Sequence, residues 1–245
     1  MSGIMALTQS ELIQDQSKRL VATFAMQVII DAKTGLVFGY ELLARDVRGE
    51  DRSAAGIIER LTSTGHRRLA LEAVSYAQVM AQVAQSPRLH VNLNIEDLDL
   101  VTRMGDLTNI TIEIVEGCVD SEVLANAIEM IHERGGHAAM DDFGSPLWSE
   151  NALENDWDLV KLDKCVLSWD MERCLNLRRQ LGALCRTAKV CLEGVESAIH
   201  CQTSDWVGAD LLQGYKFGQP MIPAIHPQIE FQENEVSQPK ANSLW

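Results

Sequence analysis

Residues 136–144 read Gly-His-Ala-Ala-Met-Asp-Asp-Phe-Gly, a short apolar run that stops on two adjacent carboxylates, Asp141 and Asp142. The pattern predicts a buried strand that carries both acids to its C-terminal end and then turns at Gly144. Adjacent carboxylates raise each other's pKa unless a cation lies between them. Two environments keep both ionised, a pair of hard divalent cations or the water around a solvated turn.

Strand patterns recur along the chain, and their repetition predicts the fold. Two apolar strands joined by a short polar turn come first and fit a hairpin. Five further apolar runs and a weaker sixth follow, separated by helical stretches. The predicted strands are 24–30, 36–44, 89–93, 110–115, 137–140, 159–162, 190–192 and 209–212, and the predicted helices are 55–61, 67–83, 121–133, 171–188 and 197–207.

Repeated strand–helix units of this number favour an α/β fold, a TIM-like (β/α)8 barrel. An open doubly wound sheet is the competing architecture, but the glycine-rich first turn typical of it is missing from the sequence. Residues 1–23 are predicted to form an N-terminal helical extension that begins at a capping box, Thr8–Glu11. Residues 24–225 are the predicted barrel domain, and 226–245 a loose polar C-terminal tail.

Composition narrows the classes of partner. The 245 residues carry 35 acidic and 21 basic side chains, a formal net charge of −14. This excess argues against binding to a DNA or RNA polymer or to a membrane surface, whose binding sites are basic. It does not exclude a small anionic ligand held by local cations.

The cysteines and the hydropathy pattern suggest where the protein works. Six cysteines include no C-x-x-C pair, and the N-terminus lacks a basic, apolar leader. No apolar run approaches the roughly 18 residues of a spanning helix. We therefore expect no disulfide framework and no membrane insertion, and a cytoplasmic location.

Polar side chains stand at the ends of the predicted strands, and in a βα barrel those ends open onto one face. Because side chains alternate along a strand, Glu113 should point into the barrel mouth and Ile112 and Ile114 away from it. An isolated buried carboxylate is costly, so several converging oxygens predict a cage for Mg²⁺ or Mn²⁺. The alternative is a ring of salt bridges and loop caps. The polar set is Glu41, Asn92, Glu113, Asp141, Asp142, Lys161, Asp163, Glu193, Glu196 and Gln213.

Seven short motifs, in order and with βα spacing, carry a resemblance to one family. They are Glu41-x-Leu43-x-Arg45, Val91-Asn92-Leu93, Glu113-x-x-Glu116, Asp141-Asp142-Phe143-Gly144, Lys161-x-Asp163, Glu193-Gly194-Val195-Glu196, and Gln213-Gly214-Tyr215 with Gly218 and Pro220. From about Phe24 to Pro220 the chain resembles an EAL domain, the bacterial family of cyclic di-GMP phosphodiesterases.

The resemblance implies a barrel with one antiparallel strand, two divalent ions (Mg²⁺ or Mn²⁺) and hydrolysis of cyclic di-GMP to linear pGpG. It implies that Glu41, Asn92, Glu113 and Asp141 bind one metal, and that Asp141 bridges to a second beside Asp142 and Glu193. The implied catalytic residues are Lys161, which would orient or deprotonate the attacking water, Glu193 and Glu41. The implied substrate-binding residues are Gln27, Arg45, Asp163, Gln213 and Glu196.

The sequence departs from the family pattern mainly after Gly144. Residues 145–151 read Ser-Pro-Leu-Trp-Ser-Glu-Asn, where the family has a Thr-Gly-Tyr-Ser-Ser-like loop associated with metal, substrate and dimer contacts. Pro146 stiffens this loop. Trp148 has three interpretations: a base-stacking platform, a partner contact or a cap on the barrel. Smaller changes are Leu42 in the name motif, Val28 after Gln27, and Val115 in place of threonine.

Two hypotheses of different classes follow. The first is a metal-dependent phosphodiesterase, with a possible homodimer formed through the loops at the barrel mouth. The second is an EAL-like module of weak or no activity that acts by binding cyclic di-GMP or a protein partner. The retained ligand residues favour the enzyme, and the altered loop keeps the binding module open. Turnover of cyclic di-GMP distinguishes the two.

Overall fold

A computed structural model describes residues 20–47, 54–83, 86–115, 117, 120–144, 148 and 150–237. Its strands close into a barrel in the order β2-β3-β4-β5-β6-β7-β8-β1, with β1 paired back to β2. The barrel strands are β1 (Val21–Asp31), β2 (Val37–Asp46), β3 (Arg88–Asn94), β4 (Ile110–Val115), β5 (His137–Phe143), β6 (Leu159–Leu162), β7 (Lys189–Leu192) and β8 (Leu211–Gln213). The predicted TIM-like barrel is confirmed.

Strand β1 is the one antiparallel member of this barrel, as expected. It pairs antiparallel with β2 on one side and with β8 on the other, whereas β2 through β8 pair in parallel. The two registers place Gln27 opposite Glu41, and Ile29 opposite Gln213. The hairpin therefore brings Gln27, Glu41 and Gln213 to one side of the barrel mouth.

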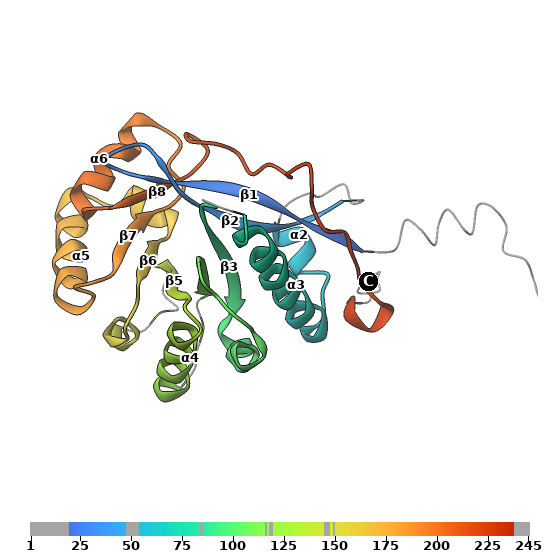
Figure 1. Cartoon of the computed structure of the whole chain (residues 1–245). Coiled ribbons are helices and arrows are strands. Elements are labelled where there is room, and N and C mark those ends of the chain that lie inside the picture. Colours follow the sequence, from blue (N-terminus) through green and yellow to red (C-terminus); the bar gives the residue numbers. More distant parts are fainter. Residues whose placement is uncertain are drawn as a thin grey trace, which may run out of the picture.

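Figure 1 shows the α-helices on the outer side of the strands. They are α2 (Ala54–Ile58), α3 (Ser63–Ala81), α4 (Ser121–Glu133), α5 (Met171–Leu184) and α6 (Ala198–Val207). Short polar side chains begin three of them: Thr62 accepts a hydrogen bond from the backbone N–H of Gly65, Asp120 from that of Glu122, and Asp170 from that of Arg173. Gly208 ends α6 in the left-handed conformation.

Two connections are formed by 3₁₀ helices instead of α-helices, η1 (Ile95–Arg103) between β3 and β4 and η2 (Glu150–Glu154) between β5 and β6. The sequence of η1 explains its geometry. Ile95, Leu98 and Val101 recur at intervals of three and are all buried, which matches the three residues per turn of a 3₁₀ helix. A third 3₁₀ segment, η3 (Lys164–Ser168), begins at the barrel mouth after β6.

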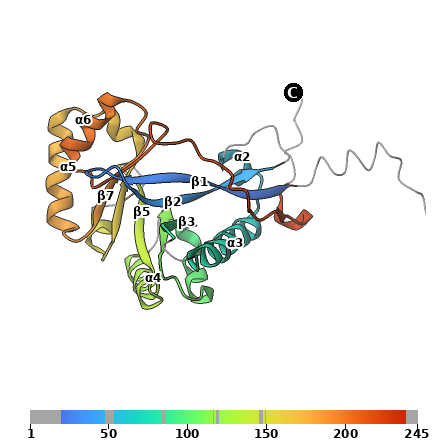
Figure 2. The same cartoon turned by 45° about the horizontal axis from the view of Figure 1, so that its top comes forward.

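Both ends of the barrel domain differ from the prediction. Residues 21–23 belong to β1 and not to a helical extension, while residues 1–19 lie outside the described part of the chain. The prediction of a loose polar tail was wrong for residues 228–237. Strand β9 (Ile229–Glu230) pairs with the start of β1, and η4 (Glu233–Glu235) follows it. In both views this C-terminal segment runs along β1 towards α3 (Figure 1 and Figure 2).

An apolar floor lies inside the barrel beneath the predicted site. It consists of Ile29, Ala139, Leu159, Cys191 and Leu211, with Phe38 packed against them. Each of the five stands two residues from a polar residue of the predicted site on the same strand or at its end, for example Ala139 from Asp141 and Leu159 from Lys161. Side chains two apart share a strand face, so the polar groups form the next layer towards the mouth. Among the described residues no helix is both long and apolar enough to cross a membrane.

Candidate active site

Lys161 lies at the centre of the polar layer, with 1% of its surface exposed. Its Nζ lies 2.7 Å from Glu113 Oε2, 2.9 Å from Asp141 Oδ1, 2.9 Å from Glu193 Oε1 and 3.6 Å from Glu41 Oε2. These four acids come from four different strands or strand ends. The barrel thus brings together side chains that are up to 152 positions apart in the sequence, from position 41 to position 193.

Two amide side chains complete the surroundings of Glu41. Asn92 donates a hydrogen bond of 2.8 Å to Glu41 Oε1, and Gln213 donates one to Glu41 Oε2. The same Gln213 amide lies 3.4 Å from Gln27 Oε1. Gln27, Glu41, Asn92 and Gln213 therefore form one connected group at the β1, β2, β3 and β8 side of the mouth.

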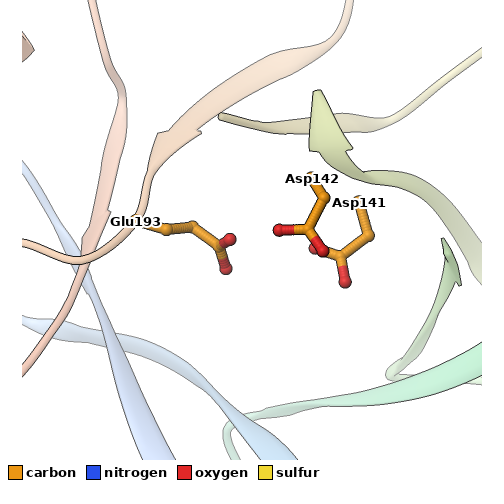
Figure 3. A group of neighbouring side chains, drawn as sticks. All are labelled: Asp141, Asp142 and Glu193. Atoms are coloured by element: carbon orange, nitrogen blue, oxygen red, sulfur yellow. The ribbon is translucent and has the colours of Figure 1, made fainter. Parts of the chain in front are cut away.

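Asp142 and Glu193 extend the acid cluster towards solvent. One carboxylate oxygen from each of Asp141, Asp142 and Glu193 lies within 4.8 Å of the others. Figure 3 shows Glu193 pointing across the mouth at the two aspartates. The pairing of β5 with β6 is irregular between Met140 and Phe143, and Asp142 has a left-handed φ of 52°. This irregularity brings neighbouring carboxylates, which would alternate in a regular strand, to the same cluster.

Trp148 supports this irregular strand end from the divergent loop. Its indole N–H donates a hydrogen bond to the backbone carbonyl of Asp141, and its ring meets that of Trp157 edge-on with centroids 6.1 Å apart. Trp148 is buried, so the structure favours the cap among its three interpretations. The neighbouring Ser145–Leu147 and Ser149, and Glu116 after β4, lie outside the described residues.

Burial dominates the electrostatics of the acids. It raises the pKa of Glu193 to about 8, although Lys161 acts against it, and it raises the pKa values of Asp141 and Glu113. Burial acts in the same direction on Glu41, but Lys161, Asn92 and Gln213 outweigh it and hold the pKa of Glu41 below its usual value. Burial therefore favours the protonated forms of Glu113, Asp141 and Glu193, whereas Glu41 stays ionised.

The lysine shows the converse behaviour. Burial alone would lower the pKa of Lys161, but Asp141, Glu113, Glu193 and Glu41 raise it well above its usual value. Lys161 is therefore an ammonium group in this arrangement. It is one positive charge among five acids, the four that it contacts and Asp142.

The donor set fits hard divalent cations. Every side-chain ligand atom available in the cluster of Asp141, Asp142 and Glu193 is a carboxylate oxygen, the type that Mg²⁺, Mn²⁺ and Ca²⁺ prefer. Burial raises the pKa values of Asp141 and Glu193, so their ionised forms are unfavourable at the same place. A divalent cation there would stabilise those ionised forms.

Three predicted substrate-binding residues lie apart from this connected group. Arg45 is half-buried and donates a 2.7 Å hydrogen bond to the carbonyl of Ala44. Asp163 caps η3 by accepting from the backbone N–H of Cys165. The side chain of Glu196 is exposed, and its backbone N–H donates to His200. The structure gives none of the three a direct contact with the carboxylate cluster.

His90 is a residue of the site that the sequence-based reasoning did not single out. It is fully buried, and its Nδ1 lies 2.8 Å from Glu113 Oε1. Burial lowers the pKa of His90 well below its usual value, so the ring is neutral. The strand period was a usable signal: His90 stands two positions before Asn92 and so shares its inward face.

Comparisons with known proteins agree with this geometry. The EAL domain model matches residues 10–220. Over 203 residues the chain is 30% identical to the cyclic di-GMP phosphodiesterase CdgJ of Vibrio cholerae serotype O1, covering 81% of this chain and 44% of CdgJ. The chain thus spans less than half the length of that curated relative.

Solved structures show the same architecture. A standalone versatile EAL protein from Vibrio cholerae O395, in its c-di-GMP-bound form, has a TM-score of 0.66 and 25% identity, covering 82% of this chain and 92% of that protein. BlrP1 of Klebsiella pneumoniae, in a complex with manganese and cyclic di-GMP, has a TM-score of 0.68 and 20% identity, covering 83% and 59%. This chain belongs to the EAL domain family, and it is homologous to a cyclic di-GMP phosphodiesterase.

Proposed function

We propose that this chain hydrolyses cyclic di-GMP to linear pGpG with the help of two divalent cations, Mg²⁺ or Mn²⁺. The observation that carries the proposal is the convergence of four carboxylates on one buried lysine at the mouth of an EAL barrel, with a fifth carboxylate, that of Asp142, beside two of them. Such a cluster is costly to bury without cations, and a cationic centre is suited to an anionic phosphodiester. The relative CdgJ is named for the same activity.

The side chains divide between two cation positions. Glu41, Asn92, Glu113 and Asp141 would hold one cation, and Asp141 would be shared with a second beside Asp142 and Glu193. When bound, the cations would stabilise the attacking and leaving oxygens of an in-line displacement. Asp141 fits the shared role because it lies both within reach of Lys161 and within the cluster of three acids.

Lys161 acts on the attacking water as a donor. Its ammonium group is held by carboxylates on several sides, so it can orient a water molecule through a hydrogen bond but has no lone pair to take a proton. Of the two roles implied by the family resemblance, we propose orientation. We assign acceptance of the proton to Glu193 or Glu41, the two other catalytic residues that the family resemblance implies. The water oxygen bonds to phosphorus, the bond from phosphorus to the 3′ oxygen breaks, and that oxygen leaves as the 3′ hydroxyl.

Substrate contacts would come from the rim of the mouth. Gln27 and Gln213 present amide groups beside Glu41, and Arg45 lies on the same hairpin strand as Glu41. We assign to these three the phosphate and base region of the substrate. Asp163 and Glu196 lie at the ends of neighbouring strands and complete the proposed rim.

The direct test is conversion of cyclic di-GMP by the purified chain with Mg²⁺ or Mn²⁺, followed by chromatography of the product. Linear pGpG should form, and it should disappear in Glu41→Ala and Lys161→Ala. Glu129→Gln is a control, because Glu129 is an exposed acid on α4 outside the site. Binding of cyclic di-GMP and metal without turnover would refute the enzyme and support the binding module.

The cellular location and the oligomeric state of the protein are also proposals. We propose a cytoplasmic protein, because Cys165, Cys174, Cys185, Cys191 and Cys201 are all free thiols, as expected in a reducing compartment. We propose a homodimer through the loops at the barrel mouth, which analytical ultracentrifugation would detect. Binding to nucleic-acid polymers is not expected at a net charge of −14.

The proposed domain is the barrel of residues 24–225, extended to include 21–23 and 226–237.

A further inference from the structure

His90 and Glu113 form a fully buried pair beneath the candidate cation site. His90 lies in β3 and Glu113 in the adjacent parallel strand β4, and both side chains are 0% exposed. Nδ1 of His90 lies 2.8 Å from Oε1 of Glu113, while Oε2 of Glu113 lies 2.7 Å from Lys161 Nζ. Each carboxylate oxygen of Glu113 therefore meets a different neighbour.

We propose that His90 is a positioning residue for Glu113. Its imidazole donates from Nδ1 to Oε1 and so turns Oε2 towards Lys161 and the cation site. A glutamate carboxylate rotates easily about its last torsion, and a donor behind it fixes the plane in which its ligand oxygen lies. The inference rests on the proposed function insofar as that function places a cation at Glu113.

The second nitrogen of His90 indicates which tautomer is present. Nε2 is buried and has no hydrogen-bond partner among the described residues. A proton on Nε2 would leave a buried N–H unpaired, which is costly, whereas a proton on Nδ1 is used by Glu113. The unpaired nitrogen and the donated hydrogen bond are thus two consequences of the same tautomer.

The packing around the ring holds it in this orientation. Gly39 of the neighbouring strand β2 has no side chain, and a Cβ there would lie 3.2 Å from the imidazole and 2.6 Å from the carbonyl of Arg88. Phe38 meets the imidazole at 62° with centroids 6.1 Å apart. The glycine leaves room for the ring and the phenylalanine bounds it, so His90 has little freedom to turn away from Glu113.

Three substitutions separate positioning from mere packing. His90→Asn places an amide donor near the former Nδ1, His90→Gln carries its donor further out near the former Nε2, and His90→Leu has no donor. The first measurement is the affinity of the purified protein for Mn²⁺ alone, by paramagnetic resonance of the free ion. Thermal unfolding of each variant and kcat and KM for cyclic di-GMP accompany it.

We expect His90→Leu to weaken Mn²⁺ binding about 10- to 100-fold and His90→Asn to stay within about threefold of the original chain, with His90→Gln between them. Turnover should fall through kcat, with KM little changed, because His90 does not contact the substrate position. Thr111→Val is a control, since Thr111 lies opposite His90 in the same buried layer and makes no described contact with Glu113. Its Mn²⁺ affinity should not change.

Unchanged Mn²⁺ affinity in His90→Leu, or an equal loss in His90→Leu and His90→Asn, would overturn the inference. If His90→Leu fails to fold, the difference between His90→Asn and His90→Gln decides the question. Failure of the proposed function looks different: the original chain would bind Mn²⁺ and yield no linear product, whatever the effect of changing His90.

Discussion

The indole N–H of Trp148 donates a hydrogen bond to the backbone carbonyl of Asp141, seven residues earlier in the chain. At this point the pairing of β5 with β6 loses its regular register, and Asp142 adopts a left-handed φ. A carbonyl at such an irregularity needs a partner outside the sheet ladder. The divergent loop therefore supplies a support for the strand end that carries both aspartates.

Replacing Trp148 should accordingly affect both stability and activity. Trp148→Phe keeps an aromatic ring but leaves the Asp141 carbonyl unpaired, which should lower the free energy of unfolding by about 1–3 kcal/mol. It should also reduce turnover, because the aspartates lose their support. Trp157→Phe is the matched control: the indole of Trp157 donates 2.7 Å to the carbonyl of Ala152, away from the acids. Equal turnover loss in both variants would argue against the assignment.

Replacing Lys161, the ammonium group at the centre of the site, should make the stability of the protein depend on bound metal. Lys161→Met leaves Glu113, Asp141 and Glu193 without their buried partner, and a broken buried ion pair costs about 3–5 kcal/mol. We expect a large fall in the urea midpoint in EDTA and a greater rescue by Mn²⁺ than in the original chain. Lys189→Met, at an exposed position, should do neither. A midpoint that does not respond to Mn²⁺ would contradict the cation site.

The metal-free protein should lose stability as pH rises from about 6.5 to 8. The pKa of Glu193 is raised to about 8, above its ordinary 4.5, so the folded state binds more protons than the unfolded state in this range. Stability then falls with rising pH. Below about pH 6.5, His90 has the opposite effect on stability. Its pKa is lowered in the folded state, so there the unfolded state binds more protons and stability rises with pH. Urea unfolding in EDTA at several pH values measures the slope.

Glu193→Gln should flatten that slope, because the side chain no longer titrates. Mn²⁺ should flatten it too, since a cation competes with protons for the same carboxylates. Stability that rises between pH 6.5 and 8 in EDTA would show that the acids are not short of positive charge.

The space at Gly39 gives a test of the barrel interior. In Gly39→Ala the new Cβ would approach the backbone carbonyl of Arg88 to 2.6 Å, so a strand must shift. We expect a loss of about 1–3 kcal/mol, measured by urea unfolding. Gly182→Ala is the contrasting change, in α5 with open space around the new Cβ, and should stabilise by about 0.5–1 kcal/mol. If Gly39→Ala leaves the free energy of unfolding unchanged, the packing inside the barrel adjusts to the extra methyl group.

The C-terminal segment should contribute to stability. Phe231 is 6% exposed and lies under the guanidinium of Arg68, 5.5 Å from its ring centroid. Phe231→Ala should cost about 3–5 kcal/mol in the free energy of unfolding. Ile225→Ala, at a residue that is 82% exposed, should change it by less than about 0.5 kcal/mol. Similar small effects in both would restore the interpretation of a loose tail.

The sequence predicted this C-terminal segment poorly for a physical reason. Its composition is polar, and only Ile229 and Phe231, two positions apart, carry the alternation of a half-buried strand. So short a pattern is also common by chance. The strand forms because β1 offers an edge with which it pairs. The 3₁₀ connection η1 is a similar case, since its interval of three differs little from helical spacing over so few residues.

What the sequence determined by itself was the order of strands and helices and the inward face of each strand, because these follow from local periodicity and from the polar residues at strand ends. It thereby specified the barrel and most of the polar set, including Glu113 and Lys161. Only the tertiary structure decided how those side chains meet. Closure of the barrel, and not any local pattern, places Lys161 among four acids, His90 behind Glu113 and Trp148 on Asp141. Contacts between distant positions depend on register and packing, which local sequence does not encode.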